Sequence, residues 1–228
     1  MADSTSRNYV PAAGKHWRLP FYDLMAKLLG ADATRALFVE QAACRAGDRV
    51  LEIGCGTGSL LLLVTKAQPT AEVVGLDPDP NALAIARRKA RRAGVEISLD
   101  QGFADALPYP DASFDRVLSS FMFHHLSRDV KEKTLREVRR VLKPGGGFHM
   151  VDFAPSGASG KRGFTAHLIH ADRHLKDNAE ERVLGFLRNA GLADAQLLAV
   201  RPSRIGSTAY YRASAQASPS DIATRLTS

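Results

Sequence analysis

This chain contains little cysteine and no long apolar run. Only two cysteines, Cys44 and Cys55, occur among 228 residues, which is too few for a disulfide framework. No apolar run reaches the length that a membrane-spanning helix needs. Residues 1–7 are polar and lack the apolar core of a signal peptide. We therefore expect a cytoplasmic protein from a reducing compartment.

Aromatic residues are also scarce where the positive charge is concentrated. The formal net charge is +7, and much of it lies in two clusters, residues 87–92 and 136–143. Both clusters fall near the ends of predicted helices, where cations interact favourably with the helix dipole. Neither cluster is interleaved with the aromatic rings on which single-stranded nucleic acid stacks. Nucleic acid is thus disfavoured as a partner, while a peripheral contact with an anionic membrane surface remains open.

The most informative stretch is the nine-residue segment 50–58, VLEIGCGTG. It reads as a buried strand with an acidic residue, Glu52, that runs into glycines at positions 54, 56 and 58 and then into a helix. Glycine has no Cβ, so the backbone can bend sharply there and bring its N–H groups close to a ligand. The N-terminus of the following helix lies at the same place. The segment therefore predicts a cofactor cradle.

The spacing of this cradle separates two classes of cofactor. A dinucleotide fingerprint would read Gly-x-Gly-x-x-Gly, whereas here the third glycine comes one residue early. The carboxylate of Glu52 would repel phosphates and attract a cation. Asp77 ends a second predicted strand, where its carboxylate can accept hydrogen bonds from both hydroxyls of a ribose. A nucleoside with a positive centre and no phosphate fits best, and a nicotinamide enzyme is the alternative.

Five segments in register resemble the motifs of class I S-adenosylmethionine-dependent methyltransferases. They cover roughly residues 48–153 and are Glu52–Gly58, Gly75–Asp77, Gly102–Pro108, Phe114–Ser120 and Leu142–Gly146. A lone glycine motif is a weak signal, but five motifs in the right order are a strong one. The resemblance is to the small-molecule branch, the ubiquinone/menaquinone-type and methyltransferase type 11-like enzymes.

The resemblance implies an α/β fold, a Rossmann-like doubly wound sheet of seven strands, mostly parallel with one antiparallel strand near the C-terminus. The alternation of strand and helix patterns independently predicts a parallel sheet with helices on both faces. We expect strands near residues 49–53, 72–76, 96–99, 115–119, 147–152, 195–200 and 209–215. Helices are expected near residues 32–43, 59–66, 80–94, 128–142 and 180–189.

One domain is expected from the length of the chain. It spans residues 15–217, with a helical cap at 15–45 and a lid insertion at 154–178. Residues 1–14 are expected to be disordered and residues 218–228 to form a loose tail.

The resemblance also implies the cofactor, S-adenosyl-L-methionine, and the product, S-adenosyl-L-homocysteine. Glu52 would orient the loop or the ammonium group, Asp77 would hold the ribose, and Asp105 would accept a hydrogen bond from the adenine amine. Pro78 or Leu107 would flank the adenine ring. The implied cofactor contacts are Glu52, Gly54, Cys55, Gly56, Gly58, Asp77, Pro78, Ala104, Asp105 and Ser119.

Catalytic residues are harder to identify because methyl transfer from a sulfonium is a direct displacement that needs mainly alignment and exclusion of water. A base is needed only if the acceptor arrives protonated. His124 and His125 follow the fourth predicted strand, and histidine titrates near neutral pH, so they are the candidate bases. Alternatively, one of them packs or caps the start of the next helix. Asp152, at the end of the fifth predicted strand, is a weaker candidate.

The acceptor pocket is expected to be closed by aromatic residues of the N-terminal segment. Candidate acceptor contacts are Tyr9, Trp17, Tyr22, His125 and Asp152. An aromatic lid suits an apolar or aromatic small molecule, although the same rings could belong to the core. His170 and His174 lie one helical turn apart, as in a metal-binding pair, but a further ligand would have to come from elsewhere, so no metal site is predicted.

Three features that are missing narrow the methyl acceptor. Residues 119–122 lack the Asn/Asp-Pro-Pro-Tyr motif of many amino-methylating enzymes, and they lack the paired glutamates of protein arginine methyltransferases. Cysteine is too scarce for thiol-dependent arsenic methylation. We predict a small-molecule acceptor, methylated on carbon, oxygen or nitrogen by a monomer or homodimer. The alternatives are a nucleic-acid or protein methyltransferase, a nicotinamide-dependent reductase and a non-catalytic cofactor-binding subunit.

Overall fold

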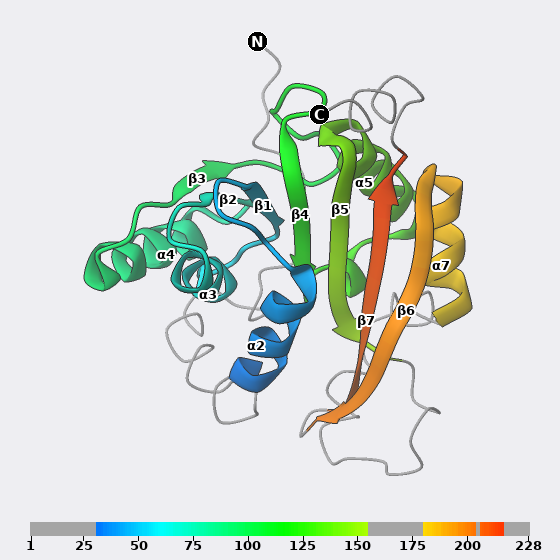
Figure 1. The fold of residues 1–228 in the computed structure, drawn as a ribbon, viewed down its shortest axis with the longest axis horizontal. Coiled ribbons are helices and arrows are strands. Elements are labelled where there is room, and N and C mark those ends of the chain that lie inside the picture. The colour runs from blue at the N-terminus through cyan, green and yellow to red at the C-terminus, as the bar shows by residue number, and fades with distance from the viewer. Residues whose placement is uncertain (1–30, 155–179, 204–205, 217–228) are drawn as a thin grey trace.

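A computed structural model describes residues 31–154, 180–203 and 206–216, which form one sheet with helices on both faces (Figure 1). The predicted disordered start, most of the lid insertion and the loose tail lie outside the described residues. The grouping of residues 15–217 into one domain therefore stays a prediction.

The sheet has seven strands in the order β3-β2-β1-β4-β5-β7-β6. In chain order the strands are β1 (Arg49–Ile53), β2 (Glu72–Asp77), β3 (Ser98–Gln101), β4 (Phe114–Ser120), β5 (Leu142–Phe153), β6 (Leu192–Ser203) and β7 (Gly206–Ala215). Strands β1 to β5 pair in parallel, and β7 runs antiparallel to both of its neighbours. The predicted fold class is thereby confirmed, including the single antiparallel strand.

Two hydrophobic clusters lie on opposite faces of the sheet. The helices are α2 (Ala31–Ala42), α3 (Ser59–Ala67), α4 (Pro80–Ala93), α5 (Arg128–Val141) and α7 (Glu180–Asn189), with a short 3-10 turn, η3 (Phe123–His125). One cluster joins α5 and α7 to Phe148 and Met150 of β5. The other joins α2, α3 and α4 to Val151 of β5. Because successive side chains of a strand point to opposite faces, a single strand supplies both cores.

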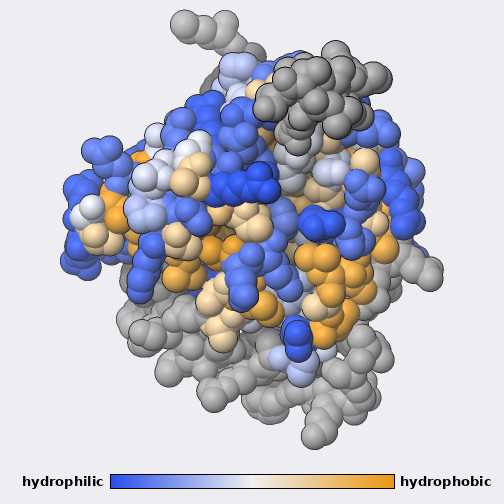
Figure 2. Space-filling view, viewed as in Figure 1, coloured by the Kyte–Doolittle hydropathy of each residue, from blue (hydrophilic) through white to orange (hydrophobic). Residues whose placement is uncertain are grey.

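Helix α4 shows how local sequence sets the ends of an element. The Asp79 side chain accepts a hydrogen bond from the Asn81 N–H at 2.9 Å, and Pro80 occupies the first helical position. Gly94 ends the helix in the left-handed conformation. The arginines of the 87–92 cluster are exposed on this helix, and hydrophilic residues lie among apolar ones on this side of the molecule in Figure 2. None of the helices in the described part of the chain is long and apolar enough to cross a bilayer.

Strand β5 begins five residues earlier than the sequence predicts. The pairing with β4 passes from Phe114–Leu142 to Arg116–Gly147, so the glycine-rich turn expected before the strand is an irregularity inside it. Because Phe114 and Leu142 still pair, the ladder continues on both sides of the extra residues of β5, as at a β-bulge. Strand β3 also differs from the prediction, because it pairs only with β2, and that pairing starts at Ser98.

Candidate active site

The motifs identified in the sequence meet at the carboxyl ends of β1, β2, β4 and β5. Ile53 pairs with Leu76 on one side and with Ser119 on the other, and Ser120 pairs with Val151, so the four strands end close to one level. The strand order reverses between β1 and β4. Ligands of open α/β sheets bind at such a point, outside the carboxyl ends of the strands. We call this edge of the sheet the rim.

The glycine loop after β1 is shaped by two different requirements. Gly54 has a φ of 67°, and its N–H donates to the Leu76 carbonyl at 2.8 Å. A Cβ on Gly54 would overlap the side chain of Met122, so the glycine lets the segment after β4 approach the loop. Gly56 has a φ of 52°, but a Cβ there would meet no atom of the described residues within 4 Å. The backbone at Gly56 therefore borders open space, as a ligand cradle requires.

Asp77 fastens this loop to the end of β2. Its Oδ2 accepts the Gly56 N–H at 2.8 Å, and its Oδ1 accepts the Asp79 N–H at 2.9 Å. Burial raises the pKa of Asp77, and the two N–H donors oppose that rise. Each carboxylate oxygen has a second lone pair, so the group can still accept a hydroxyl. The side chain is thus held at the rim in a position to accept a ligand's hydrogen bond.

Glu52 is the most unusual group at the rim. Its side chain is 3% exposed, and no described residue hydrogen-bonds its Oε2 atom. Burial raises the pKa of Glu52 well above its ordinary value; the charge of Arg35 opposes the rise and Asp77 adds to it. A buried carboxylate oxygen without a donor is destabilising. A cationic ligand beside it would relieve that cost, so Glu52 fits a ligand ammonium group.

Three of the predicted cofactor residues present no side chain to the rim. Gly58 lies at the start of α3, where a Cβ would lie 2.9 Å from the Cβ of Ala86 on α4. Cys55 is 6% exposed and packs beside Gly75, and burial raises the pKa of its thiol. Ser119 is fully buried. A cofactor contact from these residues stays a prediction and would involve their backbone.

The remaining predicted cofactor residues lie in loops after β2 and β3. Pro78 and the part-exposed Ala104 and Asp105 lie beside the ends of these strands. The Gln101 side-chain amide donates to the Pro78 carbonyl at 3.1 Å and ties the two loops together. Leu107 is buried, 5% exposed. The two loops thus lie side by side at the rim, and an adenine site between them stays a prediction.

Arg140 of α5 holds the loop after β3, a role that the sequence analysis did not predict. Its guanidinium donates to the carbonyls of Leu107 at 3.0 Å and Tyr109 at 2.8 Å. Glu137, one turn earlier, pairs with Arg140 and accepts the Leu107 N–H at 2.8 Å. That pairing lowers the pKa of Glu137. A Glu–Arg pair three residues apart could be recognised in the sequence, but its loop partner, about 30 residues away, could not.

His124 and Asp152 form a buried pair at the ends of β4 and β5. The His124 Nδ1 atom lies 2.7 Å from Asp152 Oδ1, and the His124 backbone N–H donates to Oδ2 at 2.9 Å. The Phe153 N–H also donates to Oδ1, at 2.7 Å. Burial alone would raise the pKa of Asp152, but His124 and the backbone donors outweigh it and hold the pKa below its ordinary value. Asp152 is therefore an ionised acceptor, and both of its oxygens have donors within the chain.

His125 lies beside this pair rather than in it. Its ring is part-exposed and stacks at a tilt on His124, with ring centroids 3.9 Å apart. The structure thus brings the two candidate bases and Asp152 together in one cluster. The predicted acceptor contacts Tyr9, Trp17 and Tyr22, and the histidines at 170 and 174, lie outside the described residues. Within the described ranges, no group of three or more His, Cys, Asp or Glu could hold a metal ion.

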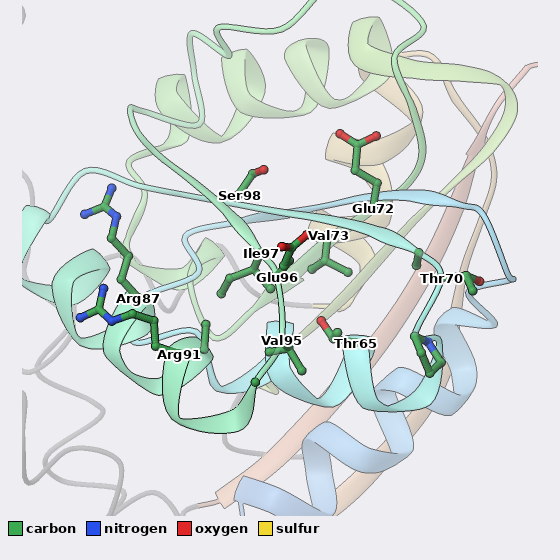
Figure 3. Close-up of a pocket in the computed structure, with 14 residues that line it drawn as sticks. Thr65, Thr70, Glu72, Val73, Arg87, Arg91, Val95, Glu96, Ile97 and Ser98 are labelled. Atoms are coloured by element: carbon green, nitrogen blue, oxygen red, sulfur yellow. The ribbon is translucent and has the colours of Figure 1, made fainter.

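A groove of about 820 Å³ lies away from the rim (Figure 3). It is bordered by the start of β2 at Glu72, the start of β3 at Ser98, and Arg87 and Arg91 of α4. These are the amino ends of the strands, opposite the end that carries Asp77. The groove is therefore separate from the candidate active site.

Comparisons with known proteins agree with the motifs. Residues 50–146 match the family described as a methyltransferase domain. The demethylmenaquinone methyltransferase of Thermus thermophilus is 44% identical over 139 residues, 60% of this chain and 62% of that protein. The cyclase SpnF superposes with a TM-score of 0.66 at 24% identity, covering 82% of each chain. Phosphoethanolamine N-methyltransferase 2 of Haemonchus contortus, in complex with S-adenosyl-L-methionine, superposes with a TM-score of 0.72 at 13% identity, over 90% of this chain and 58% of that one.

These similarities have defined limits. The chain spans 57% and 46% of the length of two further curated relatives. At less than 25% identity, the likeness to solved structures shows the fold alone. Within those limits, residues 50–146 match a methyltransferase domain, and the chain is similar to enzymes of the ubiquinone/menaquinone group.

Proposed function

We propose that this protein transfers a methyl group from S-adenosyl-L-methionine to a small-molecule acceptor and releases S-adenosyl-L-homocysteine. The observation that carries the proposal is the buried Oε2 of Glu52, which no described residue hydrogen-bonds, beside the glycine loop. An ammonium group on the ligand would supply the missing donor. Asp77 would accept from the ribose hydroxyls, and Gly56 would bring its backbone against the ligand. The cofactor, when bound, supplies an activated methyl group.

The other cofactor contacts extend along the same rim. Asp105 and Ala104 would meet the adenine, with Pro78 or Leu107 beside its ring. The side chains of Cys55 and Ser119 are buried and Gly58 has none, so any contact from these residues would use the backbone. His124, His125 and Asp152 lie on the other side of the strand-order reversal, where an acceptor would approach the methyl group.

The acceptor that we propose is apolar or aromatic. The relative in Thermus thermophilus is named for demethylmenaquinone, which has an aromatic ring system. Tyr9, Trp17 and Tyr22 would contribute to its pocket. We further propose a cytoplasmic enzyme, monomeric or homodimeric, for which a peripheral contact with an anionic membrane remains open.

The alternatives are less well supported by the site. A carboxylate at the cradle would repel the diphosphate of a nicotinamide cofactor. No described feature favours a nucleic-acid or protein acceptor over a small molecule. However, a fold shared with the cyclase SpnF does not by itself establish methyl transfer, because unrelated activities use one fold. Binding and transfer must therefore be measured separately.

Two measurements test the proposal. Calorimetry should show binding of S-adenosyl-L-homocysteine and none of NADH; the reverse result would reject the cofactor assignment. An acceptor screen with a labelled methyl donor, including quinols and phenols, should show transfer of label to a small molecule. Cofactor binding without transfer to any acceptor would instead support the non-catalytic alternative.

A further inference from the structure

We infer that His124, and not His125, is the proton acceptor of this reaction, with Asp152 as its positioning residue. The inference rests on the proposed function, and it also defines a class of acceptor. The molecule would be one whose nucleophilic atom carries an acidic proton, such as a phenol or quinol hydroxyl.

The first step of the argument is the hydrogen bonding of Asp152. Its two oxygens accept from the His124 ring, the His124 backbone N–H and the Phe153 backbone N–H. The residue is 1% exposed. A carboxylate with this many donors is ionised and serves as an acceptor only. Asp152 itself is thus not available to take a proton from an acceptor molecule.

The second step is the tautomer of His124. Because an ionised carboxylate cannot donate, the nitrogen that faces it, Nδ1, must carry the hydrogen. In the neutral imidazole, Nε2 then holds the lone pair. Among the residues that the structure describes, none hydrogen-bonds that nitrogen. The Asp152 carboxylate therefore prepares the opposite side of the ring to take up a proton.

The third step is the placement of the ring. The backbone hydrogen bond from His124 to Asp152 fixes the chain at η3. The Phe153 ring packs edge-on against the imidazole of His124, with ring centroids 5.0 Å apart. Met122, two residues earlier, lies against Gly54 of the cofactor loop. These contacts hold η3 next to the cradle. His125 follows in the same turn, with its ring centroid 3.9 Å from that of His124, and it is not among the donors to Asp152 named above.

The reaction balances with His124 in this role. As the acceptor atom bonds to the methyl carbon, the methyl–sulfur bond breaks, and its electron pair stays on sulfur as a neutral thioether. The proton of the acceptor goes to Nε2 of His124. The resulting imidazolium lies against the ionised Asp152, which stabilises it. Loss of that proton to solvent restores the starting state.

The experiment compares three conservative variants, His124→Gln, Asp152→Asn and His125→Gln, with an acceptor found in the labelled-methyl screen. Removing a positioned base costs about 10²–10⁴ in rate. We expect His124→Gln to lower kcat at least a hundredfold and Asp152→Asn about a hundredfold, with affinity for S-adenosyl-L-homocysteine within about threefold of wild type. His125→Gln should raise the KM for the acceptor more than it lowers kcat. A larger kcat loss in His125→Gln than in His124→Gln would overturn the assignment.

A second measurement separates chemistry from structural damage. Acceptor analogues with electron-withdrawing groups lose their proton without a base, so they should reduce the deficit of His124→Gln and leave wild type little changed. An equal deficit with every analogue would contradict a base role. Retained cofactor binding confirms that each variant is folded.

A third measurement needs no acceptor. Nitrogen-15 NMR of labelled histidine should show His124 protonated at Nδ1, with that preference lost in Asp152→Asn. Protonation at Nε2 in the wild type would reject this inference alone. Absence of cofactor binding would reject the proposed function instead, so the two failures are distinguishable.

Discussion

Two buried carboxylates stand at the same rim of the sheet and behave in opposite ways. Glu52 ends β1 with one oxygen that no described residue hydrogen-bonds, and burial raises its pKa. Asp152 ends β5 with both oxygens occupied, and His124 with the backbone donors lowers its pKa. Both side chains are almost wholly buried, so burial alone does not explain the difference.

The difference lies in what each carboxylate still lacks. Asp152 has all its partners within the chain, so it orders the residues around it. Glu52 has one oxygen that no described residue hydrogen-bonds, and under the proposed function a ligand would supply its partner. A carboxylate such as Asp152 positions neighbouring side chains, and one such as Glu52 would bind a ligand. Four predictions test this distinction, beginning with the largest expected effect.

Asp77 combines both behaviours, because it bonds the loop and would also bond the ligand. Asp77→Ala should weaken S-adenosyl-L-homocysteine binding about 10²–10⁴-fold, since two charge-assisted hydrogen bonds to ribose are lost at about 1.5–3 kcal/mol each. Calorimetry measures the change. Asp77→Asn, which can still accept one bond, should lose less. A loss below tenfold in the alanine variant would mean that Asp77 serves the loop only.

A third buried group, His149, is not at the rim, so it tests whether burial alone affects cofactor binding. It lies three residues before Asp152 on β5, is 5% exposed, and burial lowers its pKa to about 4, with Arg116 and Arg212 contributing. Its pKa is lower in the folded state, so the unfolded chain takes up protons first as pH falls. The free energy of unfolding should therefore fall as the pH is lowered from about 6.5 to 4, by up to about 3 kcal/mol in total.

Urea unfolding at several pH values measures this loss. His149→Gln should flatten the acid side of the stability curve, because the variant has no group there to protonate. Cofactor affinity at pH 7.5 should stay unchanged. An unchanged slope in the variant would assign the acid sensitivity to other groups.

Glu52 should couple cofactor binding to proton release. An ammonium group beside it favours the ionised carboxylate, so affinity for S-adenosyl-L-homocysteine should rise with pH through the range in which Glu52 titrates. Glu52→Gln should weaken binding about tenfold to thirtyfold, as expected for loss of one charge-assisted contact. Calorimetry in buffers of different ionisation enthalpy measures the released proton. Methylthioadenosine, which lacks the ammonium group, is the matched ligand, and an equal proton release with it would exclude Glu52 as the ammonium site.

The smallest effect is expected from Arg140, which touches the loop and not the ligand. Arg140→Met removes the hydrogen bonds to the Leu107 and Tyr109 carbonyls. Cofactor binding should weaken about threefold to tenfold, because the loop loses some order at a cost of about 1 kcal/mol. Arg136→Met, an exposed arginine on the same helix, is the control and should change nothing. Equal effects of the two variants would mean that net charge, and not the loop, is responsible.

The cofactor half of the rim could be predicted almost completely from the sequence. Its parts are contiguous: strand, Glu52, glycines and helix follow one another within one segment, and Asp77 ends the next strand. The strand ends were also predictable, because parallel strands linked by helices must bring their carboxyl ends to one edge. The glycines were predicted as a group, although only Gly56 borders open space.

The acceptor half could not be predicted in the same way. His124 and Asp152 are 28 residues apart. From the sequence alone, His124 and His125 were equally good candidates for the base. Arg140 looked like one charge in a basic cluster until the fold placed it against the loop after β3. The start of β5 was also missed, because pairing with β4 decided it.

By itself, the sequence determined the class of fold and the place of the glycine loop, since each depends on neighbours along the chain or on the order of strands. Only the tertiary structure showed that both oxygens of Asp152 have hydrogen-bond donors, whereas no described residue hydrogen-bonds one oxygen of Glu52. Hydrogen bonds between distant segments set that distinction, and they exist only once the strands lie side by side.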